Sequence, residues 1–496
     1  MHSLDSVPSR TKHVSSSSSP SRRRHGMISP FLVVALWLLV AVDPTSGSRS
    51  LGDIAHKEHV LQSHMSTKTM YPVLFRGELE DERRREEEDA ARHECRPVQL
   101  NYVVRHGTRF PTIKDIKRIE ATHAKLRSTM GEKPTKDLEW VASWSNPYEY
   151  DRAGWLAEAG VAELVSMGQR LRERFGDAFH QHFEVSRFLF EHTYKPRTRH
   201  SAMAFAFGFF GGHQPVHLTS DPIGEDEELR FFDNCPAFER SIDSNKTATI
   251  EHTKYRQSPQ MLENLNRFRS RVGTTNAASL TQKDLEAAYA GCAFDVAVRW
   301  RTNEWCSLFD EGMLHSMDYF HDLKHFYKKS HGHALAFEIA APLLQDIYRT
   351  IHQRANGEST VEGHFRFAHA ETILPFASLL NLTYFDRHLS DREGHFLADT
   401  PLDVAMRRPF RGSTLAPFSA NIGFVLYKCS KPSETEGGEV TKAPEGTSYR
   451  VQTLFHERSV RFSECGGEIL CPLDRFERMY WQWIHEYDFF SKCSAT

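Results

Sequence analysis

Residues 98–112 read VQLNYVVRHGTRFPT and join a strand pattern to a polar motif. The segment 98–104 is apolar and rich in β-branched side chains, which predicts a strand buried on both faces. The pattern ends at Arg105, His106 and Gly107. In open α/β sheets, ligands bind beyond the carboxyl ends of the strands, so this motif stands where a site is expected.

Two further segments repeat the order of strand, polar motif and helix. The short apolar run 188–192 is followed by the residues TYKPR and then by a predicted helix over 201–210, which a Gly-Gly pair closes. The run 365–368 is followed by His-Ala-Glu at 369–371 and by another predicted helix. Three such units predict an α/β sheet whose polar motifs meet in one crevice.

The octet at residues 105–112 has the composition of a phosphate site with a nucleophile. A neutral imidazole attacks phosphorus readily, which makes His106 the candidate nucleophile. Arg105 and Arg109 supply forked donors for the non-bridging phosphate oxygens. Gly107 permits a close approach of the backbone, and Pro111 stiffens the exit of the loop. The alternative interpretation is a core histidine flanked by surface arginines.

The second and third motifs supply the remaining groups for phosphoryl transfer. Arg197 is a third candidate phosphate clamp, with Arg199 as its competitor. His369 is placed to stabilise charge on the transferring phosphoryl group. Glu371 is the candidate acid that protonates the leaving alcohol and then deprotonates the attacking water.

A metal site is the alternative interpretation of the third motif. Its ligands would be His364, His369 and Glu371. No second cluster in the sequence supports this interpretation, and the arginines already supply the positive charge. The prediction is therefore a site with no metal.

Composition restricts the class of partner. The 496 residues carry 62 Lys and Arg against 65 Asp and Glu, a formal net charge of −3. This excludes a whole-chain polycation that coats nucleic acid. Among the basic residues 43 are Arg, the side chain that forks onto carboxylate or phosphate oxygens. A nearly neutral chain holds a polyanionic small molecule only through a local basic site, and no nucleic acid is expected as a partner.

The N-terminus has the features of a secretory signal. Residues 1–26 are rich in serine and carry three consecutive arginines, and the apolar run 31–42 precedes the small residues 45–48. Twelve apolar residues are too few to span a bilayer comfortably, so no stable membrane span is expected after cleavage. An uncleaved signal anchor is the alternative. The last residues contain no ER-retention tetrapeptide, which favours secretion or an endomembrane or vacuolar destination.

Cysteines and sequons agree with the secretory pathway. The eight cysteines form no CxxC pair, and an even number in this compartment favours disulfides, although eight cysteines allow 105 pairings. Asn245 and Asn381 begin sequons for glycosylation.

The chain is predicted to fall into four parts. Residues 1–48 are the signal and N-terminal extension, and residues 49–94 are a charged leader. Residues 95–220 and 346–496 form the α/β domain, with further strands over 421–427 and 449–455 and a helix within 155–175. Residues 221–345 are polar, aromatic and helical in pattern, which predicts an inserted helical domain.

These motifs resemble the histidine acid phosphatases. The octet, the pair Arg197 and Ser201, and FRFAHAETILP carry the resemblance, and the HAE triplet is similar to that of the multiple inositol polyphosphate phosphatases. Other similar segments are STKTMYP (66–72), ELRFFDNC (228–235), CAFDVA (292–297), WCSLF (305–309), DLKHFYKKSHG (322–332), PLLQDI (342–347), APFSANIGFVLYKC (416–429) and CPLDRF (471–476). The resemblance covers roughly residues 64–490.

The resemblance implies a phosphoglycerate-mutase-like α/β sandwich with an inserted helical domain and no cofactor. His106 would be the nucleophile and Glu371 the proton donor. The phosphate ligands would be Arg105, Arg109, Arg197 and His369. Beyond the octet, Lys114, Lys117 and Arg118 would be further substrate contacts or surface charges. The implied disulfides are Cys95–Cys429, Cys235–Cys493, Cys292–Cys306 and Cys465–Cys471.

The function implied is hydrolysis of inositol hexakisphosphate and lower inositol polyphosphates, with 2,3-bisphosphoglycerate as a further substrate, through a covalent phosphohistidine. One alternative is a secreted histidine acid phosphatase of broad specificity. Others are a non-catalytic relative that binds phosphorylated ligands and a metal-dependent hydrolase.

Overall fold

The computed structural model describes residues 60–71, 79–130, 136–179, 184–273, 277–382, 396–430 and 448–494. All of them belong to one unit, Ile54–Thr496, as judged by its internal contacts. The predicted signal, residues 1–48, lies outside the described residues. No helix in the described ranges is both long enough and apolar enough to cross a membrane.

A mixed sheet organises the α/β part, in the order β3-β2-β4-β1-β5-β6-β7, with β8 paired to β6. The first four strands in this order run parallel, and the rest pair antiparallel. The strands are β1 (Cys95–Arg105), β2 (Phe188–His192), β3 (Leu218–Thr219), β4 (Gly363–Ala368), β5 (Asn421–Cys429), β6 (Ser448–Phe455), β7 (Arg458–Ser459) and β8 (Leu470–Pro472).

The register brings the ends of three parallel strands to the same edge. Arg105 of β1 is level with Ala368 of β4, and His192 of β2 is level with Phe367 of β4. Each polar motif follows directly from one of these ends, as the sequence predicts.

The central strand β1 is buried on both faces, which explains its continuous apolar run. Leu100, Tyr102 and Val104 pack into one hydrophobic cluster, and Val103 packs into a second cluster. Successive strand residues point to opposite faces, so β1 contributes to both layers of core.

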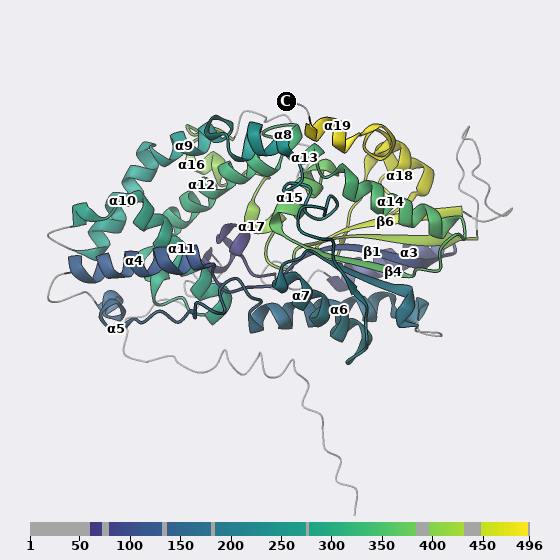
Figure 1. Ribbon diagram of the computed structural model, residues 1–496, viewed down its shortest axis with the longest axis horizontal. Coiled ribbons are helices and arrows are strands. Elements are labelled where there is room, and N and C mark those ends of the chain that lie inside the picture. The colour runs from purple at the N-terminus through teal and green to yellow at the C-terminus, as the bar shows by residue number, and fades with distance from the viewer. Residues whose placement is uncertain are drawn as a thin grey trace, which may run out of the picture. The chain divides into compact units, whose positions relative to one another are not determined.

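Helices cover the two faces of the sheet (Figure 1). On one face lie α6 (Glu158–Phe175) and α7 (Pro196–Phe210), and on the other lie α14 (Ala341–Ala355) and α15 (Ala370–Leu379). The helix predicted over 201–210 is α7, and it begins earlier than predicted, at Pro196. Proline suits the first turn of a helix, where a missing N–H costs nothing. Gly211 ends α7 with φ of 70°.

The remaining helices gather mainly beside the sheet (Figure 1). The longer ones are α4 (Ile113–Thr129), α10 (Pro259–Val272), α11 (Gln282–Arg299) and α12 (Glu311–Lys329). The shorter ones are α5 (Trp140–Ser143), α8 (Pro236–Phe238), α9 (Ile250–Arg256), α13 (Leu335–Glu338), α16 (Leu402–Ala405), α17 (Gly412–Leu415), α18 (Leu473–Met479) and α19 (Phe489–Ser494). The described part of 221–345 contains no strand, and the domain boundaries at 220 and 346 stay a prediction.

Part of the predicted leader belongs to the core. Leu61, Met65, Met70 and Tyr71 are each at most 3% exposed. The backbone of this segment, residues 60–71, bonds to α12 through Ser66 N and Asp318 Oδ1 (3.0 Å).

The charged stretch after this segment forms α3 (Leu79–Arg92). Its Glu86 and Asp89 are buried, and Glu86 pairs with Arg174 of α6. Asp89 Oδ2 accepts from Leu470 N (3.1 Å), which attaches α3 to β8. The helix is therefore only partly solvated.

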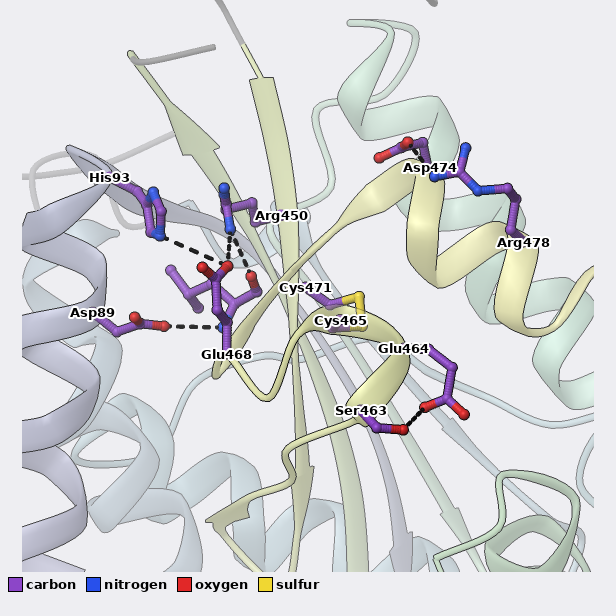
Figure 2. The surroundings of a disulfide bond; sticks show 11 residues. Asp89, His93, Arg450, Ser463, Glu464, Cys465, Glu468, Cys471, Asp474 and Arg478 are labelled. Atoms are coloured by element: carbon purple, nitrogen blue, oxygen red, sulfur yellow. Dashed lines mark hydrogen bonds and ion pairs between the residues drawn. A yellow bond between two sulfur atoms is a disulfide. The ribbon is translucent and has the colours of Figure 1, made fainter. Parts of the chain in front are cut away.

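The structure contains the four disulfides that the resemblance implies, and no free cysteine is present in the described residues. Cys95–Cys429 joins β1 to β5, and Cys235–Cys493 joins the residue before α8 to α19. Figure 2 shows Cys465–Cys471, which closes the loop before β8, beside the ion pair of Arg450 and Glu468 (2.7 Å).

Candidate active site

His106 lies immediately after β1, at the edge where the parallel strands end. Its backbone N–H donates to Ala368 O at the end of β4 (3.0 Å), and its carbonyl accepts from Ser419 N (3.1 Å). The residue is 3% exposed. Backbone bonds to two separate segments therefore hold the nucleophile candidate in place.

Helix α6 supports the same loop. Glu163 is buried and accepts hydrogen bonds from Thr108 N, Thr108 Oγ1 and Ser419 Oγ, each 2.8 Å long. A Cβ at Gly107 would lie 2.5 Å from Gly160 O, which real side chains do not tolerate. The close backbone approach expected at Gly107 is thus made to α6.

The ring of His106 has one free nitrogen. Its Nδ1 lies 2.9 Å from Gly107 O, and because a carbonyl only accepts, Nδ1 carries the proton. Burial holds the pKa of His106 well below its ordinary value, and the charges of Arg197 and Arg105 lower this pKa further. The imidazole is therefore neutral, with the lone pair of Nε2 available for attack.

A chain of hydrogen bonds fixes the second histidine. Arg197 Nη2 donates to His369 Nδ1 (3.1 Å), so the proton of the neutral ring is on Nε2, which donates to Thr193 Oγ1 (2.9 Å). Thr193 Oγ1 lies 3.0 Å from Thr198 Oγ1, and this second hydroxyl donates to Lys195 O (2.7 Å). Both threonines are fully buried.

Three arginines converge on the two histidines. Burial, together with the charge of Arg109, lowers the pKa of Arg105 to about 9 and that of Arg197 to about 10. Arg105 Nη1 donates to Thr67 O (2.5 Å) and Ala416 O (2.6 Å). Because these like charges lower one another's pKa values, the guanidinium groups repel one another and the arrangement favours an anion between them.

Lys68 adds a fourth cation from the N-terminal segment. Burial lowers its pKa to about 8; Asp115 opposes this shift, and Arg118, Arg109 and Arg105 contribute to it. Lys68 Nζ lies 5.8 Å from the ring centroid of Phe294. The segment 60–71 therefore contributes a charged group to the site as well as packing.

Glu371, in the first turn of α15, forms an ion pair with Lys329 of α12 (2.7 Å). The carboxylate is 45% exposed. Desolvation by the surrounding side chains raises the pKa of Glu371, but the ammonium of Lys329 outweighs this and holds that pKa well below its usual range. In the free protein the candidate acid is ionised.

A pocket of about 390 Å³ opens beside this pair. Its basic lining residues are Lys324, Lys328 and Lys329 of α12. Burial lowers the pKa of Lys324, and Lys329, Lys328 and Lys114 lower it further. The pocket thus holds three ammonium groups beside Glu371, and its other charged lining residues are Asp233, Glu239 and Asp243.

Comparison with family models matches residues 98–456 to the histidine phosphatase superfamily, branch 2. The chain belongs to this superfamily. The human protein named multiple inositol polyphosphate phosphatase 1 is 27% identical over 427 residues, 80% of this chain and 82% of that protein.

Solved structures show the fold of this histidine phosphatase. A phytase from D. castellii matches with a TM-score of 0.67 and 17% identity, over 93% of this chain and 92% of that chain. A Bifidobacterium longum multiple inositol polyphosphate phosphatase, in complex with inositol hexasulfate, matches with a TM-score of 0.57 and 16% identity, over 83% and 96%. The predicted family, fold class and enzyme class are confirmed.

The structure distinguishes the two candidate phosphate ligands Arg197 and Arg199. Arg197 bonds to His369, whereas Arg199 is exposed and affects the pKa values of His192 and His200.

The ligands of the metal alternative have other partners. His364 lies within β4 and bonds to Glu191 (3.2 Å) and Arg366 (2.7 Å). The described residues hold no group of three or more His, Cys, Asp or Glu arranged for a metal ion.

The residues predicted as additional substrate contacts or surface charges lie on α4. Lys114 and Lys117 are exposed near its N-terminus, and of the two only Lys114 influences a pocket residue, Lys324. Arg118 pairs with Asp115 (2.8 Å) and contributes to the lowered pKa of Lys68.

Five residues of this site were not predicted from the sequence as functional: Lys68, Glu163, Thr193, Thr198 and Lys329. Lys329 falls in a segment that carries the family resemblance, and its neighbouring lysines were the available signal. Thr193 and Thr198 had no such signal in the sequence, because a buried hydroxyl has no sequence pattern of its own.

Proposed function

We propose that this histidine phosphatase hydrolyses phosphomonoesters of inositol hexakisphosphate and lower inositol polyphosphates through a covalent phosphohistidine. The observation that carries the proposal is a neutral His106 with a free Nε2 beside Arg105, Arg109 and Arg197. Lys324, Lys328 and Lys329 line the pocket beside Glu371, and ammonium groups there favour a substrate with several phosphates over a simple aryl phosphate.

In the first step His106 Nε2 attacks phosphorus and the bond from phosphorus to the leaving oxygen breaks. The three arginines and His369 hold the non-bridging oxygens, whose charge changes during transfer. Glu371, once protonated, gives its proton to the leaving inositol oxygen.

In the second step Glu371 removes a proton from water, which attacks the phosphohistidine. The bond from Nε2 to phosphorus breaks, inorganic phosphate leaves and the neutral imidazole is restored. Microscopic reversibility assigns both proton transfers to one carboxyl group. The arginines supply the positive charge, so no metal is required in either step.

Turnover of inositol hexakisphosphate is expected with or without EDTA, and ion-exchange chromatography of the products measures it. The expected products are inorganic phosphate and lower inositol phosphates. Hydrolysis of an aryl phosphate alone would favour the broad acid phosphatase, and binding without turnover would favour the non-catalytic relative. Loss of activity with EDTA and recovery with zinc would favour the metal-dependent hydrolase.

Thr193→Val is expected to lower kcat/KM about 10- to 100-fold, since a buried hydrogen bond that loses its partner costs about 1–3 kcal/mol. The valine leaves His369 Nε2–H without an acceptor and frees the ring to turn. Steady-state kinetics across pH measures the effect. The pH dependence of kcat/KM for Thr193→Val should differ from that of the wild type, because Thr193 no longer fixes the tautomer of His369. Thr193→Ser keeps the hydroxyl and should restore most of the activity; an equal loss in both variants would contradict the positioning role.

The secretory pathway is the proposed location. Four disulfides agree with an oxidising compartment. Asn245 is partly exposed, and Asn381 is exposed although its sequon extends beyond the described residues. Both stay proposed glycosylation sites, and residues 1–48 stay the proposed signal.

A further inference from the structure

The candidate proton donor is in the wrong protonation state in the free protein. Lys329 Nζ donates to Glu371 Oε1 at 2.7 Å, and the ammonium is only 17% exposed. A carboxylate in a close ion pair does not carry a proton to donate. Either another group is the acid, or binding of substrate breaks this pair.

The pocket supplies the means to break it. Lys329 lines the pocket together with Lys324 and Lys328 of the same helix, α12, and Lys328 bonds to Asp243 Oδ1 (2.7 Å). A phosphate group in this pocket carries at least the negative charge of one carboxylate, and a sulfate group carries the same charge as a carboxylate, so either group competes with Glu371 for Lys329. The same phosphate places new negative charge beside Glu371.

We propose that Lys329 exchanges Glu371 for a second phosphate of the substrate, and that the released carboxyl group takes up the proton that it then donates to the leaving oxygen. This inference rests on the proposed function. It makes a second phosphate on the ring the condition for an active acid, because a monophosphate held at His106 leaves the pair of Lys329 and Glu371 intact. Lys329 is thus a positioning residue that sets substrate class.

The other charged and titratable groups around Glu371 lie on several elements that surround it. Those that influence its pKa, or are influenced by it, are His325 and Lys329 of α12, Arg105 and Arg109 after β1, Arg197 of α7, and His369 before α15. The charged pocket walls beyond them are Asp233, Glu239, Asp243, Lys324 and Lys328. The exchange is therefore tested by a comparison of variants, since several groups respond to a bound anion.

The first experiment measures proton uptake by the wild-type chain. Inositol hexasulfate is the probe, because its sulfate groups keep a fixed charge near neutral pH. Calorimetric titration at about pH 6, in two buffers of different ionisation enthalpy, should show more protons taken up by the wild type than by Glu371→Gln. Equal uptake in the two proteins would overturn the proposal, even if inositol hexakisphosphate is hydrolysed normally.

The second experiment compares two substrates with the same leaving group. The measured quantity is the single-turnover rate of phosphorylation at saturating substrate, as a function of pH. As the pH rises this rate declines, and the declining limb should begin at a lower pH for an inositol monophosphate than for inositol hexakisphosphate. Lys329→Met should move the monophosphate limb up by about 1–3 pH units, the effect of removing a close opposite charge. The difference between the substrates should then disappear.

Controls separate this exchange from a general charge effect. Lys254→Met breaks an exposed pair of the same length, Lys254 with Glu251 at 2.7 Å, and should leave both profiles unchanged. Lys329→Arg keeps the charge and should keep the difference between substrates. A monophosphate limb that does not move in a folded Lys329→Met variant would overturn the proposal. Failure of the wild type to hydrolyse inositol hexakisphosphate would instead refute the proposed function.

Discussion

His106→Ala is expected to lower kcat for inositol hexakisphosphate on the order of 10⁶-fold, the size of loss seen when a covalent nucleophile is removed from a hydrolase. No other described nucleophile lies where Nε2 lies, since His369 has both ring nitrogens in hydrogen bonds. Steady-state release of inorganic phosphate measures the loss.

Binding should survive the same substitution. The arginines that hold the phosphate are unchanged, and one of them, Arg105, is anchored by Thr67 O and Ala416 O rather than by His106. Calorimetric titration with inositol hexasulfate should give an affinity within about 10-fold of the wild type, the size of one lost hydrogen bond. Full activity of folded His106→Ala protein would refute the mechanism.

Glu371→Gln is expected to lower the phosphorylation rate with inositol hexakisphosphate by about 10²- to 10⁴-fold, the usual contribution of a general acid. The inositol oxygen is a poor leaving group and needs the proton. An aryl phosphate releases a stable phenolate, so its first step should be nearly unaffected.

The two steps can be separated in this variant with p-nitrophenyl phosphate. The first step stays fast and the second step loses its base, so stopped-flow absorbance should show a burst of about one nitrophenolate per chain, followed by slow turnover. No burst is expected with the inositol substrate. An equal loss of the phosphorylation rate for both substrates would show that Glu371 is not the acid.

The strands and their motifs could be predicted because each rests on local pattern. Buried apolar runs gave β1, β2, β4, β5 and β6 to within a few residues, and the three polar motifs followed from strand ends. The start of α7 was placed too late, although Pro196 is itself a signal for a first turn.

The connections within the site depend on distant residues and could not be predicted. Thr193 and His369 are 176 residues apart, and Lys329 and Glu371 are 42 apart. Their contact follows from the packing of α7, α12 and α15 around one strand edge, which no local pattern specifies. Likewise, the segment 60–71 was placed in a leader because charged sequence follows it, while its own apolar residues fill the core.

The most direct test of the covalent mechanism is to trap the phosphoenzyme. Wild-type protein is mixed with inositol hexakisphosphate, quenched within milliseconds in alkaline denaturant, which preserves phosphohistidine, and digested for mass spectrometry. The account predicts one phosphate on His106, present in the wild type, accumulating in Glu371→Gln supplied with an aryl phosphate, and absent from His106→Ala. Turnover with no phosphate on His106 at any time, or phosphate on another residue, would contradict it.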